Sequence, residues 1–229
     1  MKAVELTAVK KHYMLGETRV DALRGVSITI EKGEFLAIAG PSGAGKSTIL
    51  NLIGCIDTPS EGQVFIDGTE VEHLNDTELT RYRRQKLGFI FQSFNLIPVL
   101  NVFENIEFPL LLRKSLSRKE REGIVMHFVE EVGLADRLKN KPNELSGGQR
   151  QRVAIARALV TSPLIVLADE PTANLDSETG HRIVDVMREI NQHEKTTFIF
   201  STHDEHIMEH ARRVISIRDG AVTGDRVKA

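Results

Sequence analysis

The chain has 229 residues, of which 41% are hydrophobic and 27% charged, a composition typical of a water-soluble globular domain and unlike that of a disordered or fibrous protein. Its formal net charge of −2 argues against a general attraction to nucleic acid, so we expect no nucleic-acid partner. The single cysteine, Cys55, excludes an internal disulfide. We expect no signal peptide and no membrane-spanning segment, because asparagines and glutamates interrupt the most apolar stretch, residues 98–112.

The first β-forming segments are residues 3–9 and 26–31. Together with residues 63–68 they predict a small, mainly antiparallel sheet near the functional site. Tyr13 lies between the first two segments, in an expected loop. If that loop folds over a phosphate site, the tyrosine ring can stack on a nucleotide base, and the alternative is that the ring only packs.

The most specific motif follows residues 35–39, an apolar run typical of a buried strand, and precedes residues 48–53, which have helical spacing. In this strand–loop–helix context the sequence fits G-x-x-x-x-G-K-[ST] at every constrained position, which predicts a triphosphate site. Lys46 should reach the β- and γ-phosphates, and Ser47 should hold Mg²⁺. The loop residues are Gly40, Pro41, Ser42, Gly43, Ala44, Gly45, Lys46, Ser47 and Thr48.

Residues 76–86 predict a polar helix, and residues 87–91 predict a buried strand that ends at Gln92. The amide of Gln92 can reach a metal ion or an attacking water, or it can cap a loop. Five of the ten phenylalanines fall between Phe89 and Phe108. They predict either a local core or an exposed apolar groove that receives a helix of a partner.

A capping box at Ser117 and Glu120 predicts a helix that ends at Gly133. The expected contacts of this region are local, so we expect a single domain in which a helical lobe is inserted into an α/β core. The expected bounds are 1–229 for the domain, about 95–159 for the lobe, and 1–94 with 160–229 for the core.

A second group of small residues precedes a helix predicted at residues 150–160. Ser146 and the backbone N–H groups after it can grip a phosphate, or Ser146 can be a plain helix N-cap. Because the phosphates of one nucleotide rarely need two such binding segments from the same polypeptide, we expect the second segment to face a nucleotide held by another copy. The segment consists of Leu145, Ser146, Gly147, Gly148 and Gln149.

Residues 164–168 are a continuous apolar run, typical of a central strand buried on both faces, and the run ends at Asp169 and Glu170. Beside the phosphate loop, Asp169 is placed to bind Mg²⁺ together with Ser47 or through water, and Glu170 is placed to polarise an attacking water. Alone, such an acidic pair more often starts a loop or caps a helix. The phosphate loop favours the functional interpretation.

Asp176 leads into a helix predicted from residue 177 to about 190, and residues 196–201 predict another buried strand. His203 follows that strand, where its ring can hydrogen-bond the γ-phosphate or hold the water. Residues 214–223 predict a final β-hairpin.

These motifs, in this order, resemble those of the ATP-binding cassette (ABC) transporter ATPases over essentially the full chain. The resemblance implies an α/β fold of the P-loop NTPase type, with a RecA-like, mostly parallel sheet, a small antiparallel β subdomain and an inserted helical subdomain. It implies ATP and Mg²⁺ as ligands and ATP hydrolysis coupled to transport as the activity. It also implies a homodimer in which ATP on the phosphate loop of one subunit is covered by residues 145–149 of the other.

Single residues carry further implied roles. Tyr13 resembles the aromatic residue that stacks on adenine, and Gln92 resembles the residue that senses Mg²⁺ and the membrane partner. Glu170 resembles the catalytic base, and His203 resembles the switch that holds the γ-phosphate. Asp176 resembles the residue that connects the two sites across the dimer. The implied catalytic set is Lys46, Gln92, Glu170 and His203, and the implied Mg²⁺ ligands are Ser47, Gln92 and Asp169.

A finer resemblance points to the branch that serves lipoprotein release and macrolide efflux. It rests on residues 15–17, 51–57, 88–98 and 104–106. It implies a separate integral membrane permease, a periplasmic adaptor as a further partner, and a peripheral position at the cytoplasmic face of the inner membrane. Amino-acid importers and the cell-division ATPase share parts of these stretches. A cell-division ATPase that regulates cell-wall enzymes and a soluble, non-transport ABC ATPase therefore stay open as alternatives.

Overall fold

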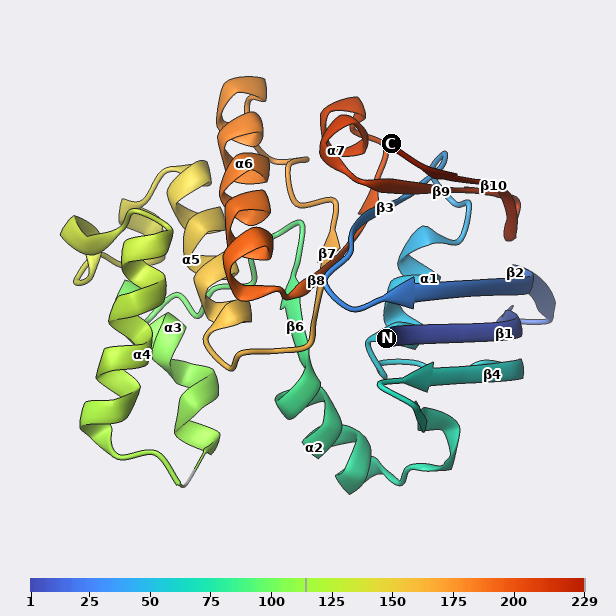
Figure 1. Ribbon diagram of the computed structural model, residues 1–229, viewed down its shortest axis with the longest axis horizontal. Coiled ribbons are helices and arrows are strands. Elements are labelled where there is room, and N and C mark those ends of the chain that lie inside the picture. Colours follow the sequence, from blue (N-terminus) through green and yellow to red (C-terminus); the bar gives the residue numbers. More distant parts are fainter. Residues whose placement is uncertain (114, 229) are drawn as a thin grey trace.

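The computed structural model describes residues 1–113 and 115–228 and contains two β-sheets, with helices packed around the larger one (Figure 1). The smaller sheet has the strand order β2-β1-β4-β5, and its neighbouring strands are antiparallel. The predicted antiparallel sheet is therefore confirmed, although its first hairpin is longer than predicted. The strands are β1 (Lys2–Leu15), β2 (Thr18–Glu31), β4 (Glu61–Ile66) and β5 (Thr69–Glu70).

The larger sheet has the strand order β10-β9-β3-β8-β7-β6. Its strands are parallel except β10, which pairs antiparallel with β9 as the predicted C-terminal hairpin. Because parallel strands share one carboxyl edge, the residues that follow β3, β6, β7 and β8 meet there. The strands are β3 (Phe35–Ala39), β6 (Leu87–Ile90), β7 (Ile165–Asp169), β8 (Thr197–Thr202), β9 (Arg213–Arg218) and β10 (Ala221–Val227).

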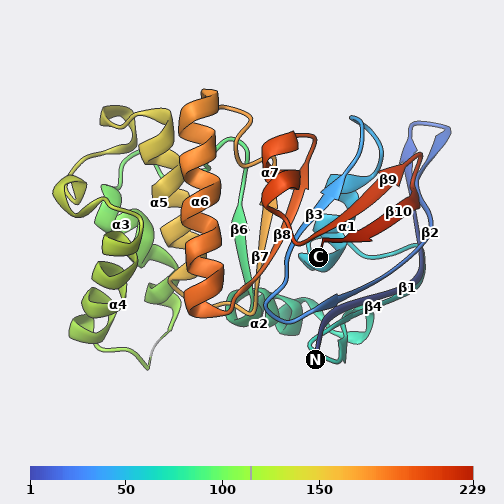
Figure 2. The same ribbon diagram turned by 45° about the horizontal axis from the view of Figure 1, so that its top comes forward.

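Helices cover both faces of the larger sheet, with α5 and α6 on one side of its strands and α1 on the other (Figures 1 and 2). Within the described ranges, no helix has the length and apolar character needed to cross a bilayer. The α-helices are α1 (Lys46–Ile53), α2 (Asp76–Lys86), α3 (Val102–Glu107), α4 (Arg118–Glu131), α5 (Gly147–Leu159), α6 (Ser177–Glu194) and α7 (Glu205–His210). The 3₁₀ helices are η1 (Val71–His73), η2 (Phe108–Leu112), η3 (Ala135–Arg137) and η4 (Pro142–Glu144).

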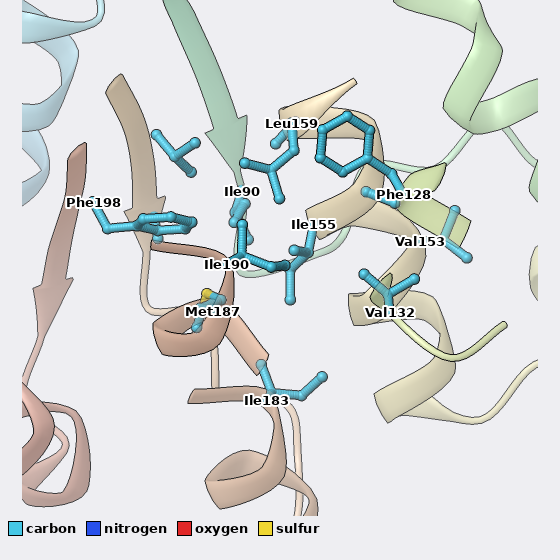
Figure 3. Packing of buried hydrophobic residues seen from close by; sticks show 14 of the residues in the cluster. Ile90, Phe128, Val132, Val153, Ile155, Leu159, Ile183, Met187, Ile190 and Phe198 are labelled. Atoms are coloured by element: carbon cyan, nitrogen blue, oxygen red, sulfur yellow. The ribbon is translucent and has the colours of Figure 1, made fainter. Parts of the chain in front are cut away.

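The central strands are apolar throughout because alternate residues enter two different cores. In β3, Ala37 faces the core formed with α3 to α6, whereas Ile38 faces the core formed with α1 and the smaller sheet. Figure 3 shows part of the first core, where Ile90 and Phe198 of the sheet lie near Ile190 of α6. Two-sided burial explains why these strands show no polar alternation in the sequence.

Hydrogen-bonded caps set the helix ends. The Glu120 N–H donates to Ser117 Oγ at 3.3 Å and the Ser117 N–H donates to the Glu120 carboxylate at 2.7 Å, which confirms the predicted capping box of α4. The helix α6 extends to Glu194, beyond the predicted end near residue 190. It continues because the buried amide of Asn191 donates to the carbonyl oxygens of Gly33 and Thr196, which ties the last turn to the sheet.

Candidate active site

The phosphate loop leaves the buried end of β3 and enters α1. Gly45, the N-cap of α1, has a φ of 103°, and a Cβ there would lie 2.7 Å from the Ala22 carbonyl oxygen, so only glycine fits. The buried Lys46 side chain folds back across the loop. Its Nζ donates to the carbonyl oxygens of Gly40 at 2.8 Å and Pro41 at 3.1 Å, so the ammonium lies within the concave loop.

Two oxygen donors meet beside this loop. The Ser47 hydroxyl donates to the Asp169 carboxylate at 3.1 Å, which links the first turn of α1 to the end of β7. Hydroxyl and carboxylate oxygens are donors that Mg²⁺ prefers, so the pair fits the ion. Across residues 1–113 and 115–228, no group of three or more His, Cys, Asp or Glu residues is arranged to hold a metal by itself.

Glu170 stands in a left-handed backbone conformation, with a φ of 47°, directly after β7. Its N–H donates to the Ser201 carbonyl oxygen at 2.9 Å, which fixes the backbone against β8. The carboxylate oxygen Oε1 lies 2.9 Å from His203 Nδ1 and 3.9 Å from Lys46 Nζ. A carboxylate is thus held between two basic side chains at the edge of the phosphate loop.

These side chains line one open cleft of ≈ 670 Å³. Gln92 lies in the same cleft, and its backbone carbonyl oxygen accepts a hydrogen bond from the side-chain amide of Asn174 at 2.8 Å. The cleft also contains residues that the sequence analysis missed, namely Val20, Asp21, Ala22 and Ala173. Val20, Asp21 and Ala22 reach the cleft because the β1–β2 hairpin is long, whereas Ala173 lies in the segment after β7. No motif in the sequence marks these positions.

The predicted loop around Tyr13 is wrong. Tyr13 lies within β1 and pairs with Val20 of β2, because the hairpin turn comes only at residues 16–17. The Tyr13 hydroxyl donates to the Asp57 carboxylate at 2.8 Å. Burial, followed by this hydrogen bond, raises the pKa of the Tyr13 hydroxyl. The ring is therefore held by the sheet and does not swing on a loop.

The segment 145–149 forms the start of α5. The Ser146 hydroxyl accepts from the Gln149 N–H at 3.3 Å while the Ser146 N–H donates to the Gln149 side chain at 2.9 Å, so Ser146 is an N-cap in a capping box. A Cβ at Gly148 would lie 2.4 Å from Thr179 Cγ2, which places the segment tightly against α6. Among the described residues that line the ≈ 670 Å³ cleft, none belongs to 145–149.

Asp176 caps the next helix. Its carboxylate accepts from the Thr179 N–H at 3.0 Å, and this backbone hydrogen bond lowers the pKa of the Asp176 carboxyl. Asp176 shares a small cavity of ≈ 250 Å³ with Glu170 and His203. The residues that follow β7 and β8 therefore lie together at one edge of the main sheet.

A second, apolar groove of ≈ 410 Å³ lies between α2, the end of β6, η2 and α5. Phe89 and Phe91 stack there with ring centroids 5.8 Å apart, and Phe108 and Leu112 are exposed beside them. Of the two predictions for the phenylalanine-rich segment, the exposed groove therefore holds for these rings, whereas Phe103 packs against the core. The charged lining residues in the described part of the chain are Arg83, Arg84 and Arg157, without a carboxylate.

Known proteins share both the sequence and this architecture. A family model described as ABC transporter matches residues 23–173. The chain is 47% identical to the ABC transporter ATP-binding protein MJ0796 of Methanocaldococcus jannaschii over 222 residues, which cover 96% of this chain and 94% of that protein. It is 43% identical to the macrolide export ATP-binding/permease protein MacB of Bdellovibrio bacteriovorus over 97% of this chain, but spans only 34% of MacB.

A solved structure also resembles the whole chain. It is the dimeric structure of a post-hydrolysis state of the ATP-binding cassette MJ0796 bound to ADP and Pi. It superimposes with a TM-score of 0.90 at 45% sequence identity and covers 98% of both chains. The α/β fold with a P-loop that the sequence predicts is thereby confirmed.

Proposed function

This chain belongs to the ABC transporter family and is an ATP-hydrolysing subunit, and we propose that two copies close around two ATP molecules to drive a separate membrane permease. The observation that carries the proposal is the cleft in which the Lys46 ammonium, the Ser47–Asp169 pair and the Glu170–His203 pair converge. The structure of MJ0796 in a dimeric state with ADP and Pi, the products of ATP hydrolysis, supports it by similarity.

We assign the triphosphate to the loop of residues 40–48. The Lys46 ammonium would exchange its two carbonyl contacts for the β- and γ-phosphate oxygens. Backbone N–H groups at the N-terminus of α1 would supply further donors. Thr48, in the first turn of α1, belongs to the same binding segment.

The Ser47 hydroxyl and the Asp169 carboxylate would hold Mg²⁺, with the Gln92 side chain as a third protein group from across the cleft. When bound, the ion neutralises charge on the β- and γ-phosphate oxygens. The hydrogen bond between Ser47 and Asp169 supports this assignment, because it keeps both oxygens beside the phosphate loop.

We assign Glu170 as the general base. Its carboxylate would accept a proton from the attacking water. The contact of His203 Nδ1 with Glu170 Oε1 supports a paired role, in which the imidazole orients the carboxylate and contacts the γ-phosphate. The backbone of Glu170 is fixed on β8, so the carboxylate is presented without a mobile loop.

The second cradle, residues 145–149, would act on the ATP of the other subunit. Support comes from two observations. Among the described residues, this segment does not line its own chain's cleft. Ser146 caps the N-terminus of α5, where the first backbone N–H groups suit an anion. Asp176, which shares a cavity with His203, would connect the two sites across the dimer.

We propose that the base of ATP stacks on Tyr13. Support comes from the strand pairing, because Val20, the cross-strand partner of Tyr13, lines the cleft. The helical lobe of about residues 95–159 would move as the dimer closes, because it carries the cradle at 145–149.

The apolar groove next to β6 is the proposed docking site of the permease. Exposed Phe108 and Leu112 can bury an apolar helix face, and the guanidinium groups of Arg84 and Arg157 favour a partner helix that carries a carboxylate. Gln92 follows the same strand, so the groove and the nucleotide cleft are joined through β6.

The branch of the family is a further proposal. The similarity to MacB supports export or extraction of macrolide-like or lipoprotein substrates, at the cytoplasmic face of the inner membrane and with a periplasmic adaptor as an additional partner. This chain spans 34% of the length of MacB, and the proposal takes the permease as a separate partner.

Two measurements test the proposal. Steady-state ATPase activity per chain should rise with protein concentration, because each site is completed by a second copy. Equal activity in strictly monomeric and in concentrated samples would refute the shared site.

Co-purification from membranes should yield an integral membrane protein with the wild type and lose it with Arg84→Glu, whereas the distant exposed Arg182→Glu should retain it. Recovery of ribosomes or nucleic acid in its place would refute the permease.

A further inference from the structure

Asp57 connects two side chains of β1 to the segment that follows α1. One carboxylate oxygen accepts from the Tyr13 hydroxyl at 2.8 Å, and the other accepts from Lys11 Nζ at 2.6 Å. The Lys11 ammonium also donates to the Thr58 carbonyl oxygen at 2.8 Å. The Lys11 and Asp57 side chains are only 11% and 26% exposed, so solvent screens this ion pair weakly.

The same lysine covers one face of the tyrosine ring. Lys11 Nζ lies 5.0 Å from the Tyr13 ring centroid, within the range of a cation–π contact. With the hydroxyl bonded to Asp57 and one face covered by Lys11, rotation of the ring is restricted. A planar ligand can then stack only on the opposite face.

This cluster stands next to the phosphate loop. Val20, the cross-strand partner of Tyr13, lines the nucleotide cleft together with Thr48 of α1. The helix α1 begins at Lys46, and the chain reaches Asp57 shortly after its C-cap Gly54. The helix α1 therefore lies between the phosphate loop and Asp57, whose carboxylate holds the aromatic ring.

We propose that Asp57 is a positioning residue for the nucleotide base: with Lys11, it fixes the Tyr13 ring in the orientation in which a purine stacks on its free face. The inference rests on the proposed stacking role of Tyr13. Asp57 acts through the ring and contacts neither the base nor the phosphates. It therefore contributes to binding of the base and not to the hydrolytic step.

The experiment compares Tyr13→Phe, Asp57→Ala and the double variant in the full-length protein. Calorimetry measures binding of Mg–ATP and of Mg–tripolyphosphate, which has the phosphates but no base. Each single variant should weaken ATP binding about twofold to tenfold, the range expected when binding must order one more side chain. The double variant should be no weaker than the worse single variant. The KM for ATP should rise with kcat unchanged, and tripolyphosphate binding should not change.

The exposed ion pair between Lys10 and Glu61 offers a matched control, because it also joins β1 to the chain after α1, with a distance of 2.6 Å. Lys10→Gln and Glu61→Gln should leave ATP binding unchanged. Equal weakening of ATP and tripolyphosphate binding by Asp57→Ala would show general loosening and overturn the proposal, as would additive effects in the double variant. If Asp57→Ala fails to fold, unchanged ATP binding in Tyr13→Phe would still overturn it. A wild type that binds neither ligand would instead refute the proposed function.

Discussion

Glu170 and His203 directly follow two neighbouring parallel strands, and Oε1 of the carboxylate lies 2.9 Å from Nδ1 of the imidazole. Glu170 follows β7 and His203 follows β8, so the sheet itself brings them together. The Glu170 N–H donates to Ser201 on β8, and this bond holds the residue in its left-handed conformation. The direction of the carboxylate is therefore set by the strand pairing, which suits a group that must be in place before ATP arrives.

Glu170→Gln removes the proposed general base but keeps the shape of the side chain. Because general-base help contributes about 10²- to 10⁴-fold, we expect turnover to fall by about that factor. ATP should still bind, and closed dimers should accumulate, which size-exclusion chromatography with light scattering detects. Glu189→Gln, exposed on α6, serves as the control. Undiminished steady-state turnover would remove Glu170 from this role.

The chain contains a matched pair of helix caps that separates capping from nucleotide binding. Ser146 and Ser117 both close a capping box with the residue three positions later. Ser146→Arg and Ser117→Arg should therefore cost the same helix stability, about 0.5–2 kcal/mol. Only Ser146→Arg should abolish ATP-dependent dimerisation and turnover, because only that position would face the partner's ATP. Equal loss of dimerisation and turnover in both variants would show that loss of the helix cap alone causes the effect.

Local patterns were enough to predict most of the fold. The apolar runs at 35–39 and 164–168 are strands buried on both faces, and the capping box at Ser117 opens α4 where expected. These features are specified by neighbouring residues: strand burial by composition and helix starts by side-chain caps. The meeting of Ser47 with Asp169 was also foreseeable, because parallel strands deliver their carboxyl ends to one edge.

The remaining features depend on contacts between distant residues. The β1–β2 hairpin extends past its apolar residues through polar ones, so the apolar pattern wrongly predicts a loop at Tyr13. The partners of its hydroxyl and of Lys11 lie in the segment after α1, 44 and 46 residues away. Asp57 ends the stretch 51–57 that carries part of the finer resemblance, but this resemblance implies no contact with Tyr13 or Lys11. Only the folded chain shows that Asp57 supports the aromatic ring.

Asp67 predicts a specific dependence of stability on pH. Its carboxylate forms an ion pair with Lys32 at 2.5 Å and accepts a hydrogen bond from Lys86 Nζ at 2.8 Å, and these two contacts lower the pKa of the carboxyl. A carboxyl whose pKa is lowered by folding stabilises the protein above its unfolded pKa of about 4, and this contribution is lost as the pH falls through the folded pKa. Asp67→Asn should therefore lower the free energy of unfolding by about 1 kcal/mol at neutral pH.

Urea unfolding at a series of pH values measures this difference. The gap between the wild type and Asp67→Asn should shrink below about pH 4, where the Asp67 carboxyl of the unfolded chain binds a proton, and should vanish below the lowered pKa of the folded state. Asp136→Asn is the control, because the Asp136 side chain is 72% exposed beside Arg137. A gap that stays constant through the acidic range would show that the lysine contacts are not its source.

Cys55 should be nearly inert in the folded protein. Burial raises the pKa of its thiol to about 11, against a smaller opposite effect of Arg83. At pH 8 only about 0.1% is thiolate, the form that reacts with alkylating reagents. Mass spectrometry should therefore find labelling only when the protein unfolds, and Mg–ATP should slow it further by stabilising the native state. Gln192→Cys in a Cys55→Ala background should react at once, and equally fast labelling of Cys55 would contradict its burial.

Gly220 links the C-terminal hairpin to the phosphate loop. Its N–H donates to the Ala44 carbonyl oxygen at 3.1 Å, and its φ is 77°. A Cβ there would lie 2.7 Å from the carbonyl oxygen of Ala22, a residue that lines the nucleotide cleft. Gly220→Ala should therefore cost about 1–3 kcal/mol of stability. It should also weaken ATP binding, because the clash with Ala22 would shift residue 220, whose N–H donates to the Ala44 carbonyl oxygen of the phosphate loop. Thermal unfolding and calorimetry measure the two effects.

The matched control for Gly220 lies in the same hairpin. A Cβ at Gly224 would meet only Ser216 side-chain atoms at 3.7 Å, an ordinary van der Waals distance. Gly224→Ala should therefore change neither the melting temperature nor ATP affinity appreciably. If Gly220→Ala lowered stability but left ATP affinity intact, the hairpin would support the sheet without bracing the phosphate loop. If both variants weakened ATP binding equally, the contact of Gly220 with Ala44 would not be the cause, since only Gly220 touches the loop backbone.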